Sequence, residues 1–177
     1  MPSDSATLPP AGDDLAAVAL ACEQFFARCG SVMLATVSAA GEPHVSYAPV
    51  VADARHQLYL LLSDLAAHSA NLRRHGAGEV MMIEGEGEAR NPFARQRLTL
   101  RCRVAELARG SEPYRQRLAQ LRQAHGETVA LLATLADFRL LCLTPASGRF
   151  VRGFGRAYGV SRVDGALVVE GPVVPAR

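Results

Sequence analysis

Apolar residues at helical spacing form the first regular pattern along the chain. Asp13 and Asp14 are both suitable as the N-cap of a helix, and Gly30 is a stop signal. Residues 1–12 precede this pattern, and we predict a flexible N-terminal tail there. We predict that the helix packs on a larger body, because one helix cannot bury its own apolar stripe. The stripe consists of Leu15, Val18, Ala19, Cys22, Phe25 and Phe26.

Alternating apolar and polar positions then predict β-strands. Residues 31–38 and 44–51 are rich in strand-forming residues and flank a turn at Gly41, so we predict a hairpin. The clearest strand is 96–107, whose side chains alternate between two faces. One face carries Leu98, Leu100, Cys102 and Val104, and the other carries Arg97, Thr99, Arg101 and Arg103.

The rest of the pattern mixes short strands with helices. A helix at 65–75 has Ser63 or Asp64 as its predicted cap and ends at Gly76. Two helices, separated by Gly126, are predicted within 111–136. The remaining predictions are strands at 57–62, 79–84, 138–145, 149–155 and 166–174, a turn at 145–148 and a solvated hairpin tip at 85–95.

Strands in hairpins with helices between them predict a mainly β (α+β) fold, an antiparallel barrel with peripheral helices. We predict a single barrel domain over residues 13–177, with the helices at 111–136 as an insertion. No repeat or low-complexity linker divides this range.

Composition narrows the chemistry that this fold can carry. All 19 basic residues are arginine, so a Schiff-base lysine, a phosphate-binding Walker lysine and a lysine general base are excluded. A net charge of +2 does not favour a nucleic-acid or membrane-surface partner. The chain has no recognisable signal peptide and no apolar run of ~20 residues, so we expect a cytoplasmic protein. The four cysteines are scattered, and we expect buried thiols.

The arginine face of strand 96–107 has two interpretations. Arg97, Arg101 and Arg103 either face solvent beside cross-strand carboxylates, or they form a binding site for an anion such as phosphate or carboxylate. The N-terminus of helix 65–75 is a second candidate anion site. Together these features suit a phosphorylated cofactor or a dicarboxylate ligand.

Histidine and glycine positions add less specific candidates. No two of the five histidines have the spacing of a zinc-binding pair, and His68 either reaches a ligand or is simply exposed. The Gly153-Phe154-Gly155 segment allows close approach of a neighbouring strand or of a flat ligand.

Four motifs together resemble the FMN-binding split-barrel family related to pyridoxamine 5′-phosphate oxidase, and more narrowly its haem-utilisation branch. The resemblance extends over residues 31–159 and implies a six-stranded split barrel that forms a homodimer, with its ligand between protomers. The motifs are Ser-Tyr-Ala-Pro at 46–49, His-x-x-Asn-Leu at 68–72, Phe-Ala-Arg-x-Arg-Leu-Thr at 93–99 and Gly-Arg-Phe-Val-x-Gly-Phe-Gly-x-Ala-Tyr at 148–158.

The resemblance also implies a cofactor site for haem or FMN. His68 occupies a position at which many flavin-binding relatives have a lysine. In the haem branch the same cleft takes haem, whose propionates bind arginine. The positions that match the phosphate-binding residues of flavin-binding relatives are Ser63, His68, Ser69, Asn71 and Arg97.

Asp137 matches an acidic residue that, in haem-degrading relatives, hydrogen-bonds the histidine ligand of the iron. That histidine is near the C-terminus in the relatives, whereas the residues after Tyr158 here contain no His, Cys, Tyr or Met. Either His68, His44 or His75 replaces it, or this chain has lost haem chemistry. The resemblance therefore leaves three functions open, namely oxidative haem degradation, FMN-dependent oxidoreduction and non-catalytic carriage of haem or flavin.

Overall fold

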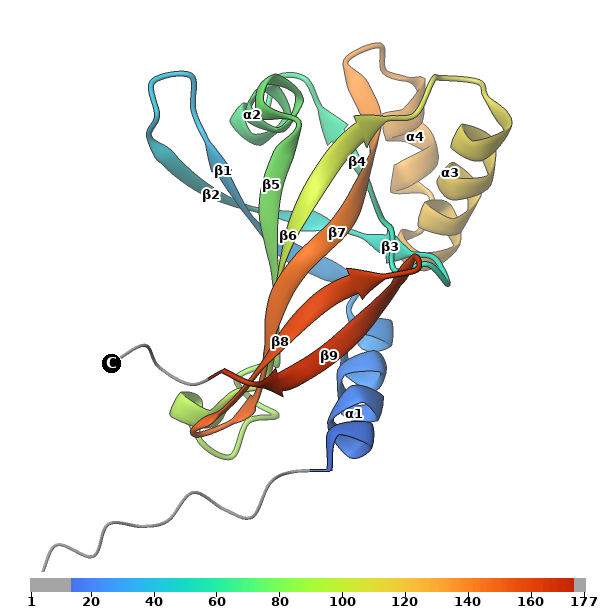
Figure 1. Ribbon diagram of the computed structural model, residues 1–177. Coiled ribbons are helices and arrows are strands. Elements are labelled where there is room, and N and C mark those ends of the chain that lie inside the picture. Colours follow the sequence, from blue (N-terminus) through green and yellow to red (C-terminus); the bar gives the residue numbers. More distant parts are fainter. Residues whose placement is uncertain (1–13, 174–177) are drawn as a thin grey trace, which may run out of the picture.

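A computed structural model describes residues 14–173, and the tail expected at 1–12 lies outside the described residues. Helices are interspersed among groups of strands along the chain, as the sequence pattern indicates (Figure 1). In chain order the elements are α1 (Leu15–Arg28), β1 (Ser31–Val37), β2 (Pro43–Pro49), β3 (Val51–Ala52), β4 (Leu58–Ser63), α2 (Ala67–His75), β5 (Ala77–Ile83), the 3-10 turn η1 (Pro92–Ala94), β6 (Arg97–Glu106), α3 (Glu112–His125), α4 (Thr128–Thr134), β7 (Phe138–Gly153), β8 (Arg156–Val163) and β9 (Ala166–Pro172).

All strand pairings among the described residues are antiparallel and belong to one curled sheet, which confirms the predicted fold class (Figure 1). The strand order is β2-β1-β5-β6-β7-β4-β3, and β8 and β9 continue from β7 as a hairpin. The described sheet has nine strands rather than six, because β3 has only two residues and the β8–β9 hairpin extends beyond the barrel. The pattern had indicated no strand at β8.

The core lies on the inner face of this sheet, where each strand places alternate side chains. Leu34, Leu98, Leu100 and Phe150 are all fully buried there. Helix α1 covers one end, and the ring of Phe25 lies 6.0 Å from that of Phe150. The Asp14 side chain accepts a hydrogen bond from the N–H of Ala16, as expected for a cap.

β7 corrects the prediction of two strands separated by a turn at 145–148. It is one strand of 16 residues, which pairs with β4 at its start and with β8 at its end. Gly148 was interpreted as a turn residue, but its role is steric. A Cβ atom there would lie 2.0 Å from the carbonyl oxygen of Thr99, so glycine allows β6 and β7 to approach closely.

α2 also begins later than predicted, with Ala66 as its N-cap and no capping side chain. The predicted caps have other partners, because Ser63 contacts Asp137 and Asp64 contacts two arginines. The C-terminus agrees with the prediction, since Gly76 ends α2 in the left-handed conformation with φ of 61°.

Two helices, α3 and α4, form within 111–136 and pack on the opposite edge of the sheet from α2 (Figure 1). Arg117 of α3 binds Asp53 at 2.9 Å and lies 4.5 Å above the ring of Tyr59. The Tyr59 hydroxyl donates to the same carboxylate. In the described chain no helix combines the length and apolar character needed to cross a membrane.

Candidate functional site

Ser63 and Asp137, two predicted site residues far apart in the sequence, are in direct contact. The Ser63 hydroxyl donates a hydrogen bond of 2.6 Å to the Asp137 carboxylate. The carbonyl oxygen of Asp137 accepts a bond of 2.7 Å from the N–H of Asp64. These bonds fix the Asp137 side chain beside the end of β4, immediately before α2.

An ionic cluster next to this contact holds α2 against the sheet. The Asp64 carboxylate binds Arg139 of β7 at 2.9 Å and also pairs with Arg73 of α2. Glu106, the last residue of β6, lies 3.6 Å from Arg139 and 3.9 Å from Arg73. The hydrogen bond from Arg139, together with the charge of Arg73, holds the pKa of Asp64 below its usual value.

A group of polar side chains lies between α2 and the β1–β2 hairpin. Nδ1 of His68 is 2.9 Å from the Ser46 hydroxyl. Burial, followed by the proximity of His44, lowers the pKa of His68. Because its folded pKa lies below the usual value of about 6.5, the imidazole is neutral at neutral pH. Nδ1 of His44 is buried and has no hydrogen-bond partner among the described residues.

The other two predicted binding residues of α2 point into the protein. Asn71 is 7% exposed and donates a hydrogen bond of 3.1 Å to the Thr36 hydroxyl. Ser69 is fully buried, and its hydroxyl has no partner within the described part of the chain. In one copy of the chain, therefore, these side chains support α2 from beneath rather than form a surface.

Arg97 lies away from this group, at the opposite end of β6. Glu106 beside α2 ends β6 and Arg97 begins it, so at about 3.3 Å per residue the two ends are about 30 Å apart. Arg97 also projects from the outer face of the sheet, whereas Leu98 beside it projects into the core. One copy of the chain does not bring Arg97 together with Ser63, His68 and Asp137.

Within the described residues, none of the outer-face arginines forms an ion pair with an acidic side chain. Arg97 donates only to the carbonyl oxygen of Arg95, at 3.1 Å. Arg149 on β7 lies opposite Thr99 and joins the same face. Glu79 of β5 lies directly opposite Arg101, so a cross-strand carboxylate is present there as the first interpretation expects, but the two side chains form no ion pair within 4 Å. The outer-face set is Arg97, Arg101, Arg103 and Arg149.

A groove of about 870 Å³ begins at Arg97 and extends between η1 and the β7–β8 turn. Phe93 and Phe154 border it and are 81% and 79% exposed. The sequence pattern indicated Phe154 only as part of the glycine segment and did not indicate Arg149 as a site residue. The relevant signal was the pairing of Thr99 with Arg149, which a single sequence does not reveal.

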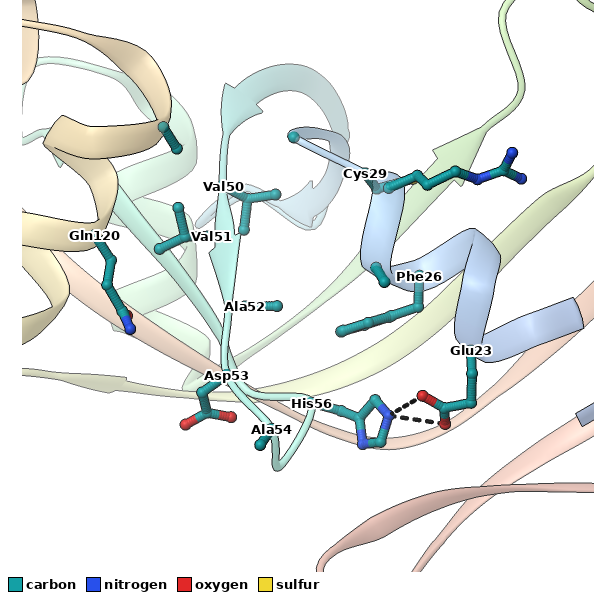
Figure 2. Close-up of a pocket in the computed structure, with 14 residues that line it drawn as sticks. Glu23, Phe26, Cys29, Val50, Val51, Ala52, Asp53, Ala54, His56 and Gln120 are labelled. Carbon is teal, nitrogen blue, oxygen red and sulfur yellow. Dashed lines mark hydrogen bonds and ion pairs between the residues drawn. The ribbon is translucent and has the colours of Figure 1, made fainter. Parts of the chain in front are cut away.

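A second pocket, of about 560 Å³, lies between α1, β3 and α3 (Figure 2). Figure 2 shows His56 beside Glu23 of α1, with Nε2 of the histidine 2.8 Å from the carboxylate. The ring of Phe26 packs edge-on against the same imidazole at 5.0 Å. Asp53 at the rim is already bound by Arg117 and Tyr59. These contacts attach α1 to the β3–β4 turn.

The four cysteines are free, and three of them are buried, as expected. Burial raises the pKa of Cys22 and of Cys102 to about 12, so both are protonated thiols at neutral pH. Among residues 14–173, no three His, Cys, Asp or Glu side chains form a group that could hold a metal ion.

Comparison with known proteins gives a consistent result. The pyridoxamine 5′-phosphate oxidase family matches residues 19–152. The Vibrio cholerae protein named Heme oxygenase HutZ is 43% identical over 134 residues, which are 76% of each chain. A crystal structure of HutZ, described as the heme storage protein from Vibrio cholerae, has a TM-score of 0.69 at 36% identity and covers 76% of this chain and 93% of that one.

The crystal structure of Campylobacter jejuni ChuZ has a TM-score of 0.79 at 29% identity. It covers 93% of this chain and 68% of the other. The family match spans most of the described residues and confirms the resemblance inferred from the four motifs. The chain belongs to the pyridoxamine 5′-phosphate oxidase family.

Proposed function

We propose that this chain binds haem through arginines on the outer face of its sheet, in a cleft between two copies. The observation that carries the proposal is the set of four outer-face arginines, none of which forms an ion pair within 4 Å in residues 14–173. Haem carries propionates, and arginine binds carboxylates through two parallel hydrogen bonds. Support comes from the HutZ relative, which is named a heme oxygenase and whose crystal structure is described as that of a heme storage protein.

The separation of Arg97 from α2 supports the need for a second copy. Arg97 lies on the outer face and at the far end of β6 from the Ser63–Asp137 contact. The outer face of β1, β2 and β5 exposes apolar side chains that a second copy would cover. The most exposed of these are Val37, Val45, Tyr47 and Ile83.

The side chains fit haem in the following roles. Haem, when bound, supplies a redox-active iron. Arg97 holds an acidic group of the ligand. His68 is neutral and therefore suited to bind a metal, and His44 beside it has an unpartnered nitrogen, so these two are the proposed iron ligands. Asp137, held by Ser63, would accept a hydrogen bond from a ligating imidazole and fix its tautomer. Buried Ser69 and Asn71 keep α2 in place.

Oxidative haem degradation is the proposed activity, with haem storage or transport as the non-catalytic alternative. Four free cysteines are typical of a reducing compartment and support the cytoplasm as the proposed location. FMN is the second candidate ligand, because arginine binds phosphate as well as it binds carboxylate and the motifs resemble those of flavin-binding relatives.

Titration of the purified protein with haem and with FMN tests the proposal. We expect haem to produce a Soret band that saturates at a stoichiometric ratio. Loss of the band with ascorbate supports degradation, whereas a stable band supports storage. Yellow protein after purification, or saturable binding of FMN but not of haem, would make flavin rather than haem the ligand. Failure of both ligands to bind at micromolar concentration would refute the proposal.

Arg97→Ala should weaken haem binding by about tenfold, because it removes a charge-assisted contact with an acidic group. Arg115→Ala is the matched control, since Arg115 is exposed on α3 and pairs only locally with Glu112. The control should bind haem like the wild type. Equal affinity of Arg97→Ala and the wild type would remove Arg97 from the site.

A further inference from the structure

The groove beside Arg97 has a defined floor and two sides, which binding of an acidic group by Arg97 does not by itself require. Its floor is the outer face of β6 and β7, and its two sides are η1 and the β7–β8 turn, at the end of the molecule opposite α2 (Figure 1). The floor between these turns carries the compact residues Thr99, Val151, Gly153 and Ala157. A flat molecule can therefore lie close to the sheet.

Two phenylalanines stand at the sides of the groove. Phe93 comes from η1 and Phe154 from the β7–β8 turn, so two separate segments each supply one aromatic ring. Both rings are about four-fifths exposed, although phenylalanine is among the residues most often buried in folded proteins. A Cβ atom at Gly153 would meet nothing within 4 Å, so the backbone beside Phe154 is open to a ligand.

Positive charge lines the same groove as the two rings. Arg97 and Arg149 both line the groove and, within residues 14–173, neither has an acidic side chain within 4 Å. Arginine remains charged at every physiological pH, and its planar group binds carboxylate or phosphate through two hydrogen bonds. The groove thus combines two aromatic surfaces with three arginines, because Arg156 also lines it.

We propose that Phe93 and Phe154 are a stacking clamp for the flat face of an aromatic ligand, and that Arg149 binds a second acidic group beside the one held by Arg97. The inference rests on the proposed function and adds three residues that determine ligand specificity. Aromatic rings stack on flat conjugated systems, and the arginines fix the end of the ligand that carries its acids. Such a site selects planar molecules with acidic substituents over compact anions.

Alanine substitutions test the clamp. Phe93→Ala and Phe154→Ala should each weaken haem binding about tenfold, and the double variant about a hundredfold, because each removes one stacking surface. Leu131→Ala is the control, since Leu131 is 65% exposed on α4, away from the groove. Circular dichroism checks that each variant is folded. Phe93→Leu and Phe154→Leu retain apolar area without a ring, and they should recover only part of the affinity.

The outcomes separate the clamp from the proposed function. If wild-type protein fails to bind haem and FMN, the proposed function fails. If wild-type protein binds and the double alanine variant binds equally well, the clamp is refuted while the proposed function stands. Sedimentation velocity tests the alternative occupant of the groove, which is a second copy of the chain. Dissociation of the double variant into monomers would assign the two rings to an interface and would also refute the clamp.

Discussion

At the residue scale, the side chains with the clearest geometry are those that join distant parts of the sequence. The resemblance had placed Ser63 and Asp137 in one site, but only the fold brings the two into a hydrogen bond of 2.6 Å. It had also placed Ser69 and Asn71 there, and both are buried under α2. Residue type and motif position indicate which chemistry is available. They do not indicate which way a helical side chain points, because that depends on how the helix packs.

Asp64 allows a test of electrostatics at this scale. Its pKa in the folded protein lies below its usual value, chiefly because Arg139 donates a hydrogen bond to it. The carboxylate therefore stabilises the fold at pH values above its unfolded pKa of about 4, and this contribution is lost as the pH falls through the lower folded value. Asp64→Asn should lower the free energy of unfolding at pH 7. It should have no effect at pH values below the folded pKa of Asp64, where the carboxyl is protonated in both states.

Urea unfolding between pH 2 and pH 7, on wild type and variant together, measures that difference. Glu42→Gln is the control, because Glu42 is exposed and forms none of the ion pairs found among residues 14–173. High salt should reduce the effect of Asp64→Asn, since the cluster is partly exposed. A difference that is independent of pH would show that the charge of Asp64 is not the cause.

At the element scale, alternation and helical spacing predicted most of the described helices and strands, and the exceptions have physical causes. β7 was divided in two because Pro-Ala-Ser-Gly has the composition of a turn. In the fold this segment continues the strand, because β6 pairs with it along its length and a register shift at Arg101/Cys102 accommodates the irregularity. β8 follows a glycine-rich segment whose pattern is weak, and its pairing with β7 supplies what its sequence lacks.

The close approach of β6 and β7 predicts a marked effect of substitution at Gly148. Alanine would place its Cβ atom 2.0 Å from the Thr99 carbonyl oxygen, so the strands must separate locally. Gly148→Ala should lower the free energy of unfolding by about 2 kcal/mol, the usual cost of overpacking a core. Gly171→Ala on β9 is the matched control, because a Cβ atom there meets nothing within 4 Å. Equal urea midpoints for the two variants would contradict this account of β7.

At the scale of the whole molecule, the predicted site residues divide into two groups that one copy of the chain keeps apart. The group at α2 faces the interior of the β1–β2 hairpin, where His68 contacts Ser46. The second group consists of Arg97, which lies on the outer face, beside the groove at the other end of β6. The motifs predicted both groups, but their separation follows from the length and pleat of β6 and only becomes evident in the fold. A site that uses both groups requires two copies.

Tyr47→Asp tests that requirement. Tyr47 is 60% exposed on the outer face and pairs with Met33 of β1, so a charge there would be desolvated if a second copy covers the face. We expect the dissociation constant of the dimer to rise about tenfold and haem binding to weaken in parallel. Leu131→Asp on exposed α4 should change neither property. Sedimentation equilibrium and Soret titration on the same samples measure both. A monomeric Tyr47→Asp variant that binds haem like the wild type would place the complete site within one chain, because binding would then no longer depend on a partner.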